Sequence, residues 1–148
     1  MDRHEMLALL NPVLRLREIP GRRLVPGDWS RVAQVFGRRP PESFVVFIDL
    51  LSDYSCPGAS LLGAATGQSE EGDFELAMDL EKKMPTGWPH GLVPFWVIGN
   101  GDYLALDLRR PDCAPVVLRD HADGSVQEEF SDFESFLRAL PSELADGK

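Results

Sequence analysis

Apolar residues in the first half of the chain recur at the spacing of one helix face. Downstream of Asp28 they fall at i, i+3, i+4 and i+7: Trp29, Val32, Ala33 and Phe36. This spacing predicts an amphipathic helix, with Asp28 as its capping residue and Gly37 at its end.

A second helix is predicted after the double proline Pro40-Pro41, which suits a helix start. The segment "PESFVVFIDLLSDY" repeats the same spacing at Phe44, Phe47, Ile48 and Leu51. Its β-branched residues also suit a strand, but the stripe and the proline start favour a helix. The segment "GRRPP" joins the two predicted helices, which form the first half of the core.

The segments on either side of these helices are less regular. Met6 and Leu10 lie in a short N-terminal helix that Pro12 interrupts, and two Pro-Gly pairs mark a connector before Asp28. In the middle of the chain we expect a short strand near residues 60–64 and a helical turn around residues 74–80.

The hydrophobic period changes to two in "PFWVIGNGDYLALDL", residues 94–108. Asn100-Gly101 separates two such runs, and this dipeptide predicts a tight hairpin because both turn positions tolerate positive φ. Leu104, Leu106 and Leu108 should share one face. The runs "APVVLRD" and "SVQEEF" continue the pattern as an antiparallel meander.

A final helix is predicted in "SDFESFLRALP". Ser131 and Glu134 have the spacing of a capping box, and Pro141 should end the helix. The apolar stripe consists of Phe133, Phe136, Leu137 and Leu140. Helices, then consecutive strands, then one helix predict an α+β fold, with about four to six antiparallel strands and with N-terminal helices and a C-terminal helix packed against the sheet.

Composition indicates a soluble globular chain of the length of one domain, because 43% of its 148 residues are hydrophobic and 26% are charged. The net charge of -9 is uneven. Residues 1–39 hold eight Lys or Arg and four Asp or Glu, whereas residues 40–148 hold seven and twenty. We expect no nucleic-acid partner for the acidic part, no membrane association and a cytoplasmic location. A basic protein partner suits the charge, although net charge also serves solubility alone.

The glycine segment 99–102 does not fit a phosphate loop. A dinucleotide fingerprint needs a third glycine where Leu104 stands, and a helix after it instead of a strand. We expect no cofactor.

A metal site is not expected, because no two of the candidate ligands have helical spacing. These candidates are His4, His90, His121, Cys56 and Cys113. The two cysteines are read as reduced, packed thiols.

The acidic residues mark no catalytic pair. Asp49 and Asp53 lie one turn apart on the second predicted helix and are expected on its solvated face. Trp96 is a core candidate, whereas the loop residue Trp88 is either a core anchor or a binding hot spot.

In order, these segments resemble the SUKH superfamily of Smi/Knr-type domains, found in bacterial toxin-immunity proteins and fungal cell-wall regulators. "DWSRVAQVFGRRPPESFVVFIDLLSDY" is similar to the family's opening helices, and "FWVIGNGDYLALDL", "APVVLRDH" and "FSDFESFLRAL" to its later hairpin, strand and closing helix. Residues 28–140 carry the resemblance within a single domain of residues 1–148, with residues 1–27 as N-terminal helix and connector. This chain departs from the family pattern at Pro40-Pro41 and at "SCPG".

The resemblance implies a non-catalytic protein-binding domain. Two hypotheses stay open: an immunity protein that neutralises a toxin, with a basic toxin domain as partner, or a regulatory or scaffolding module with another partner. An enzyme of unrecognised type is a third alternative, motivated only by the carboxylates of the middle segment. We expect the partner on the acidic middle segment and the tryptophan loop that follows it: Glu70, Glu71, Asp73, Glu75, Asp79, Trp88 and His90.

Overall fold

The computed structural model describes residues 1–20, 23, 25–57, 91–99, 102–110, 113–120 and 122–147. Its helical segments are α1 (Arg3–Leu10), the 3-10 helix η1 (Asn11–Val13), α2 (Pro26–Phe36), α3 (Glu42–Asp53) and α5 (Phe133–Gly147). Its strands are β1 (Arg15–Leu16), β2 (Tyr54–Ser55), β3 (Leu92–Gly99), β4 (Asp102–Asp107), β5 (Val116–Arg119) and β6 (Val126–Phe130). Among these helices, none carries an apolar run long enough to cross a membrane.

The described strands β3 to β6 form a four-stranded antiparallel sheet in sequence order, which confirms the predicted meander. Gly99 lies opposite Asp102, as the predicted hairpin requires, and the two turn residues between them lie outside the described part of the chain. A second, two-stranded pairing was not predicted. It joins β1 to β2, with Leu16 opposite Tyr54.

A bulge in β3 directs additional side chains toward the helices. Pro94 pairs with Ala105 and Trp96 pairs with Leu104, so that Phe95 is the extra residue. Phe95 is fully buried, and Trp96 packs partly buried against the same core with its ring 5.6 Å from that of Phe136. The prediction of Trp96 as a core residue is therefore confirmed.

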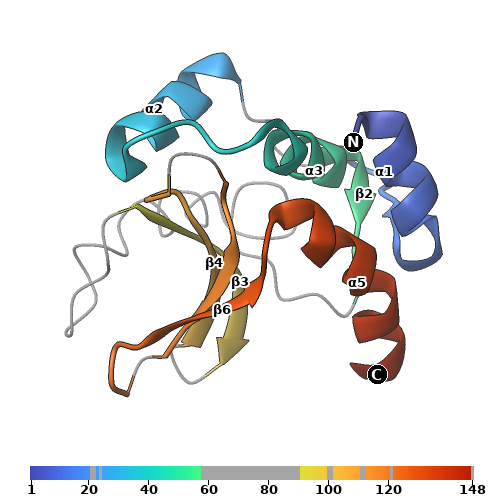
Figure 1. Cartoon of the computed structure of the whole chain (residues 1–148). Coiled ribbons are helices and arrows are strands. Elements are labelled where there is room, and N and C mark those ends of the chain that lie inside the picture. Colours follow the sequence, from blue (N-terminus) through green and yellow to red (C-terminus); the bar gives the residue numbers. More distant parts are fainter. Residues whose placement is uncertain are drawn as a thin grey trace.

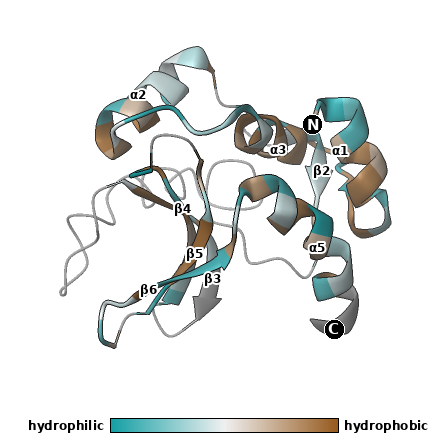
Figure 2. Ribbon diagram, viewed as in Figure 1, coloured by the Kyte–Doolittle hydropathy of each residue, from teal (hydrophilic) through white to brown (hydrophobic). Residues whose placement is uncertain are grey.

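The helices lie along one side of the sheet. Figure 1 shows α2, α3 and α1 following one another across the top of the molecule, above the sheet and α5. Helix α1 packs against both α3 and α5. Hydrophobic residues dominate α3, whereas β6 is mostly hydrophilic (Figure 2), in agreement with the exposure of its central residues. The predicted α+β fold is confirmed.

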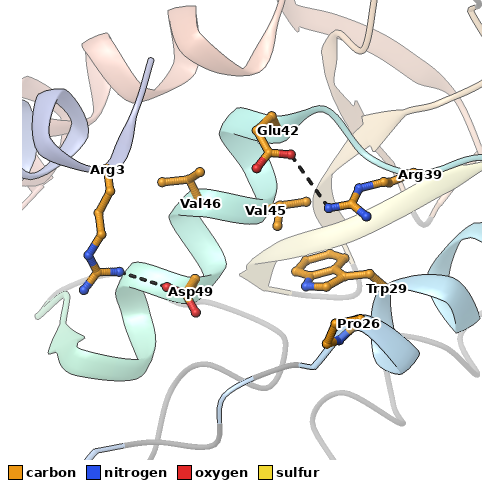
Figure 3. A pocket seen from close by; sticks show the side chains of 8 residues that line it. All are labelled: Arg3, Pro26, Trp29, Arg39, Glu42, Val45, Val46 and Asp49. Carbon is orange, nitrogen blue, oxygen red and sulfur yellow. Dashed lines mark hydrogen bonds and ion pairs between the residues drawn. The ribbon is translucent and has the colours of Figure 1, made fainter.

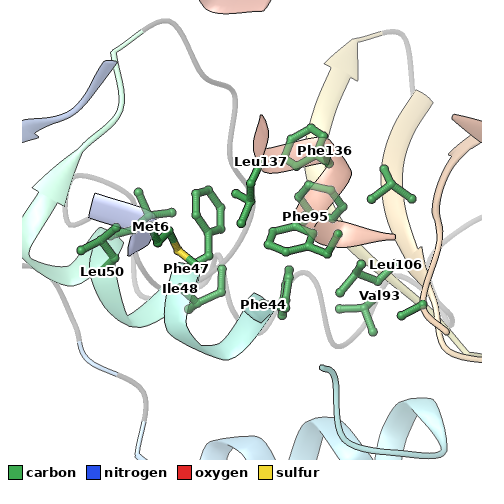
Figure 4. Packing of buried hydrophobic residues seen from close by; sticks show 14 of the residues in the cluster. Met6, Phe44, Phe47, Ile48, Leu50, Val93, Phe95, Leu106, Phe136 and Leu137 are labelled. Atoms are coloured by element: carbon green, nitrogen blue, oxygen red, sulfur yellow. The ribbon is translucent and has the colours of Figure 1, made fainter. Parts of the chain in front are cut away.

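The core is built around phenylalanine rings from α3, β3 and α5 (Figure 4). Phe44 lies 5.1 Å from Phe133 and 5.8 Å from Phe95 between ring centroids, in edge-to-face geometry. Phe133 also contacts Phe47 at 5.5 Å. Each fully buried ring contributes roughly 1.5–3 kcal/mol relative to an exposed one. The predicted stripe of α3 is confirmed, since all four of its members are buried: Phe44, Phe47, Ile48 and Leu51.

Helix α2 begins earlier than predicted, which changes the role of Asp28. The helix starts at Pro26, because the fixed φ of proline suits the first turn and its missing N–H needs no partner there. Asp28 is therefore the third helical residue, and its Oδ2 accepts a hydrogen bond from the N–H of Val25 at 2.9 Å. At the other end Gly37 has φ of 98°, which confirms it as the predicted stop.

Helix α5 corrects two further predictions. Asp132, not Ser131, caps it, because the helix begins at Phe133 and Asp132 Oδ1 accepts the N–H of Ser135 at 2.8 Å. The helix does not end at Pro141 but continues through it to Gly147. Leu144 packs against the core one turn beyond Leu140, so apolar contact sustains the helix despite the lost backbone hydrogen bond.

Candidate functional site

Helix α3 carries a second stripe on the side away from the phenylalanine core. Glu42, Val45, Val46 and Asp49 have the spacing i, i+3, i+4 and i+7 and therefore share one face. The two valines are only partly buried, and Glu42 and Asp49 lie at the two ends of the stripe. We call these four residues the outer face of α3.

The outer face of α3 forms one wall of a pocket of about 300 Å³. Helix α2 adds Pro26 and Trp29, of which Trp29 is 7% exposed. Arg39 comes from the link between α2 and α3, and Arg3 comes from α1. Figure 3 shows the two valines between Arg3 with Asp49 at one end and Arg39 with Glu42 at the other. The pocket thus has an apolar middle and an ion pair at each end.

The ion pair at the Arg3 end belongs to a network of two arginines and two aspartates. Arg3 donates to Asp49 Oδ2 at 2.9 Å and to Asp53 Oδ2 at 2.7 Å. Arg23 also contacts both aspartates, with 2.9 Å between its Nη2 and Asp53 Oδ1. The hydrogen bond from Arg23 lowers the pKa of Asp53, and that from Arg3 lowers it further, against the effect of desolvation.

This network adds partners to Asp49 and Asp53, which lie on a partly exposed face of α3 as expected. Their side chains are 39% and 28% exposed, but each carboxylate is held by two guanidinium groups instead of facing only water. The network fastens α1 and the segment before α2 to the outer face of α3. Asp49 and Asp53 are therefore structural charges at one end of the pocket.

The ion pair at the opposite end is looser. Arg39 Nη2 lies 3.7 Å from Glu42 Oε2, and the two side chains are 57% and 74% exposed. Exposed pairs of this kind contribute little to stability, so either partner is available to another charge. Glu42 is also the first residue of α3, where the helix dipole favours a carboxylate.

Arg38, the neighbour of Arg39, does not line the pocket but holds the segment after β4. Its guanidinium donates to the carbonyls of Leu108 at 3.0 Å, Arg110 at 2.7 Å and Cys113 at 2.9 Å. The buried Asp107 holds Arg109 through two side-chain hydrogen bonds of 2.9 and 3.0 Å. Arg38 thus holds three backbone carbonyls of the segment after β4, whereas Arg39 lines the pocket.

The residues predicted for partner binding lie outside the described part of the chain: Glu70, Glu71, Asp73, Glu75, Asp79, Trp88 and His90. Within the described residues, no group of three or more His, Cys, Asp or Glu side chains could hold a metal ion. Cys56 and Cys113 are free thiols, and burial raises the pKa of Cys56 to about 11.

Sequence reasoning missed the pocket although one signal was present. The spacing of Glu42, Val45, Val46 and Asp49 is as regular as that of the inner stripe. Chemically, the pocket offers apolar contact and charges. Arginine keeps its proton at all physiological pH values, so the arginines of the pocket can pair with an anionic group but are unsuited to proton transfer.

A helical layer on an antiparallel meander, with an open pocket on the helical side, defines an α+β domain. A model of the family described as SMI1-KNR4 cell-wall (SUKH) matches residues 18–140. The chain therefore belongs to the SMI1-KNR4 (SUKH) family. Among the curated proteins compared with it, none matches. The match includes α2 and α3 and begins after α1, so Arg3 joins the pocket from outside the matched segment.

Proposed function

We propose that this protein is a non-catalytic binding domain that neutralises a toxin protein by binding it directly in the cytoplasm. The observation that carries the proposal is the pocket on the helical side of a SUKH-family domain. Its middle is apolar, its rim is charged, and its tryptophan and arginines are the residue types enriched at binding hot spots. Such a surface suits a protein partner better than a reacting substrate.

The charge of the chain supports a basic toxin as the partner. The net charge is -9, and residues 40–148 hold twenty acidic against seven basic residues. Complementary charge accelerates the encounter of two proteins. We propose that the acidic middle segment and the tryptophan loop also take part in partner binding, with the acidic residues in a steering role: Glu70, Glu71, Asp73, Glu75, Asp79, Trp88 and His90.

Co-expression tests the proposal. A candidate toxin encoded beside this protein should arrest growth when expressed alone, and co-expression should restore growth and yield a co-purified complex. Continued growth arrest without a complex would reject toxin neutralisation. Changing Glu70, Glu71, Asp73 and Glu75 to lysine should slow association at low salt, and an unchanged, salt-independent rate would contradict their steering role.

A second candidate function is a regulatory or scaffolding role, which the "cell-wall" description of the family favours. The pocket would then hold a different protein partner. The neighbouring genes separate the two functions: a toxin gene beside this one favours immunity, and a cell-wall operon favours regulation.

A further inference from the structure

The two ends of the pocket differ in how firmly their charges are held. Arg3 and Asp49 belong to a network in which each has two partners at its end of α3. Arg39 and Glu42 have one contact with each other in the described part of the chain, at 3.7 Å, and both are more than half exposed. A partner's charge can therefore replace one contact at the Glu42 end without disturbing how α1 is docked.

The apolar middle of the pocket is incompletely covered. Trp29 lies against Phe44 with 6.2 Å between ring centroids, so its position is fixed by the core. Val45 and Val46 remain partly exposed beside it. A volume of about 300 Å³ is at the lower end of ligand pockets, roughly 300–1,000 Å³. This space suits one large side chain rather than a nucleotide cofactor.

We infer that the pocket receives an apolar side chain of a basic protein partner, and that a neighbouring Lys or Arg of that partner pairs with Glu42. The existence of a protein partner rests on the proposed function, whereas the choice of surface and side chains rests on the pocket itself. Glu42 is the most exposed carboxylate of the pocket, at 74%, and it is more exposed than its partner Arg39, at 57%. Its charge is therefore the more accessible of the two, which favours a cation beside the apolar group.

Arg3 closes one end of the pocket from α1, which lies outside the segment that the family model matches. Its guanidinium is held by Asp49 and Asp53, which leaves a fixed wall and limits the size of the side chain that enters. Helix α1 therefore acts as a specificity element.

Two dipeptides test the inference without any toxin: N-acetyl-Phe-Arg-amide and N-acetyl-Phe-Glu-amide, titrated into the full chain and followed by ¹H–¹⁵N NMR. The first should shift the Trp29 indole signal and the amide signals of Val45 and Val46, and it should bind at least about fivefold more tightly than the second. Equal or tighter binding of the Phe-Glu peptide would overturn the assigned charge. No shift with either peptide would overturn the pocket.

Variants link the response to the pocket. Val45→Arg should weaken the binding of the Phe-Arg peptide at least about tenfold, whereas Val126→Arg on β6, another partly exposed valine, should leave it unchanged. Glu42→Lys at a 74% exposed site keeps the fold and should reverse the preference toward the Phe-Glu peptide. A retained preference for Phe-Arg in Glu42→Lys contradicts the inference. Because no toxin is used, these outcomes are separate from the failure of toxin neutralisation.

Discussion

The two faces of α3 show how one helix can specify the fold and also line a pocket. On the inner face Phe44, Phe47 and their neighbours are buried among aromatic rings. On the outer face Val45 and Val46 are partly exposed between two ion pairs. The inner face gains its stability from complete burial. The outer face leaves apolar surface in contact with water. Covering this surface would be favourable, and in the folded domain only a bound partner could cover it.

The largest expected effect comes from adjacent substitutions on the two faces. Phe44→Ala should lower the free energy of unfolding by about 3–5 kcal/mol, because it leaves a cavity among three other rings. Val45→Ala should lower it by less than about 1 kcal/mol, since its side chain is already partly exposed. Urea denaturation of both variants measures the difference. Similar losses for the two would contradict the division between the faces.

The inner face was predictable from the sequence, because large apolar residues at a period of 3.6 place a continuous apolar stripe on one side of a helix. The exact helix starts were not predictable, because starts that differ by one or two residues have similar energies. Helix α2 begins at Pro26 although Asp28 also suits a cap, and Asp132 caps α5 although Ser131 also suits that role. The network at Asp49 depends on Arg3 and Arg23, which lie 46 and 26 positions away in sequence. No local pattern links such residues, so the charged end of the pocket needed the structure.

Arg38 and Arg39, the adjacent arginines before α3, should differ moderately in their contribution to stability. Arg38→Ala should lower the free energy of unfolding by about 1.5–3 kcal/mol, because three backbone carbonyls lose a charged donor. Arg39→Ala should change it by less than about 0.5 kcal/mol, since its ion pair is long and exposed. Thermal and urea denaturation of the two variants provide the measurement. Equal losses of unfolding free energy in the two variants would contradict the role of Arg38 in holding the segment after β4.

The smallest effect concerns the network that docks α1. Arg23→Ala should lower the free energy of unfolding by about 0.5–1 kcal/mol at low salt and by less near 1 M salt, where the Debye length is about 3 Å. Arg138→Ala, which removes a single exposed pair of 4.0 Å, is the matched control and should have a smaller effect. A loss that does not depend on salt would argue against an electrostatic role.

The same network sets a dependence on pH. Because Arg23 and Arg3 lower the pKa of Asp53 in the folded state, the stabilisation is present above the unfolded pKa of about 3.9 and is lost as the pH falls through the folded pKa. The difference in unfolding free energy between the original protein and Asp53→Asn should therefore become smaller as the pH drops below about 4. A difference that is as large well below pH 4 as at neutral pH would contradict the lowered pKa of Asp53.

The central claim is that the outer face of α3 binds the partner. Its most direct test is the dissociation constant between the neutralised toxin and Val45→Arg, measured together with the free energy of unfolding of this variant. If the outer face of α3 is the docking surface, affinity should fall at least about tenfold while stability changes by less than about 1 kcal/mol. Val126→Arg should bind the toxin as the original protein does. An unchanged dissociation constant for a folded Val45→Arg protein would contradict the claim that the outer face binds the partner.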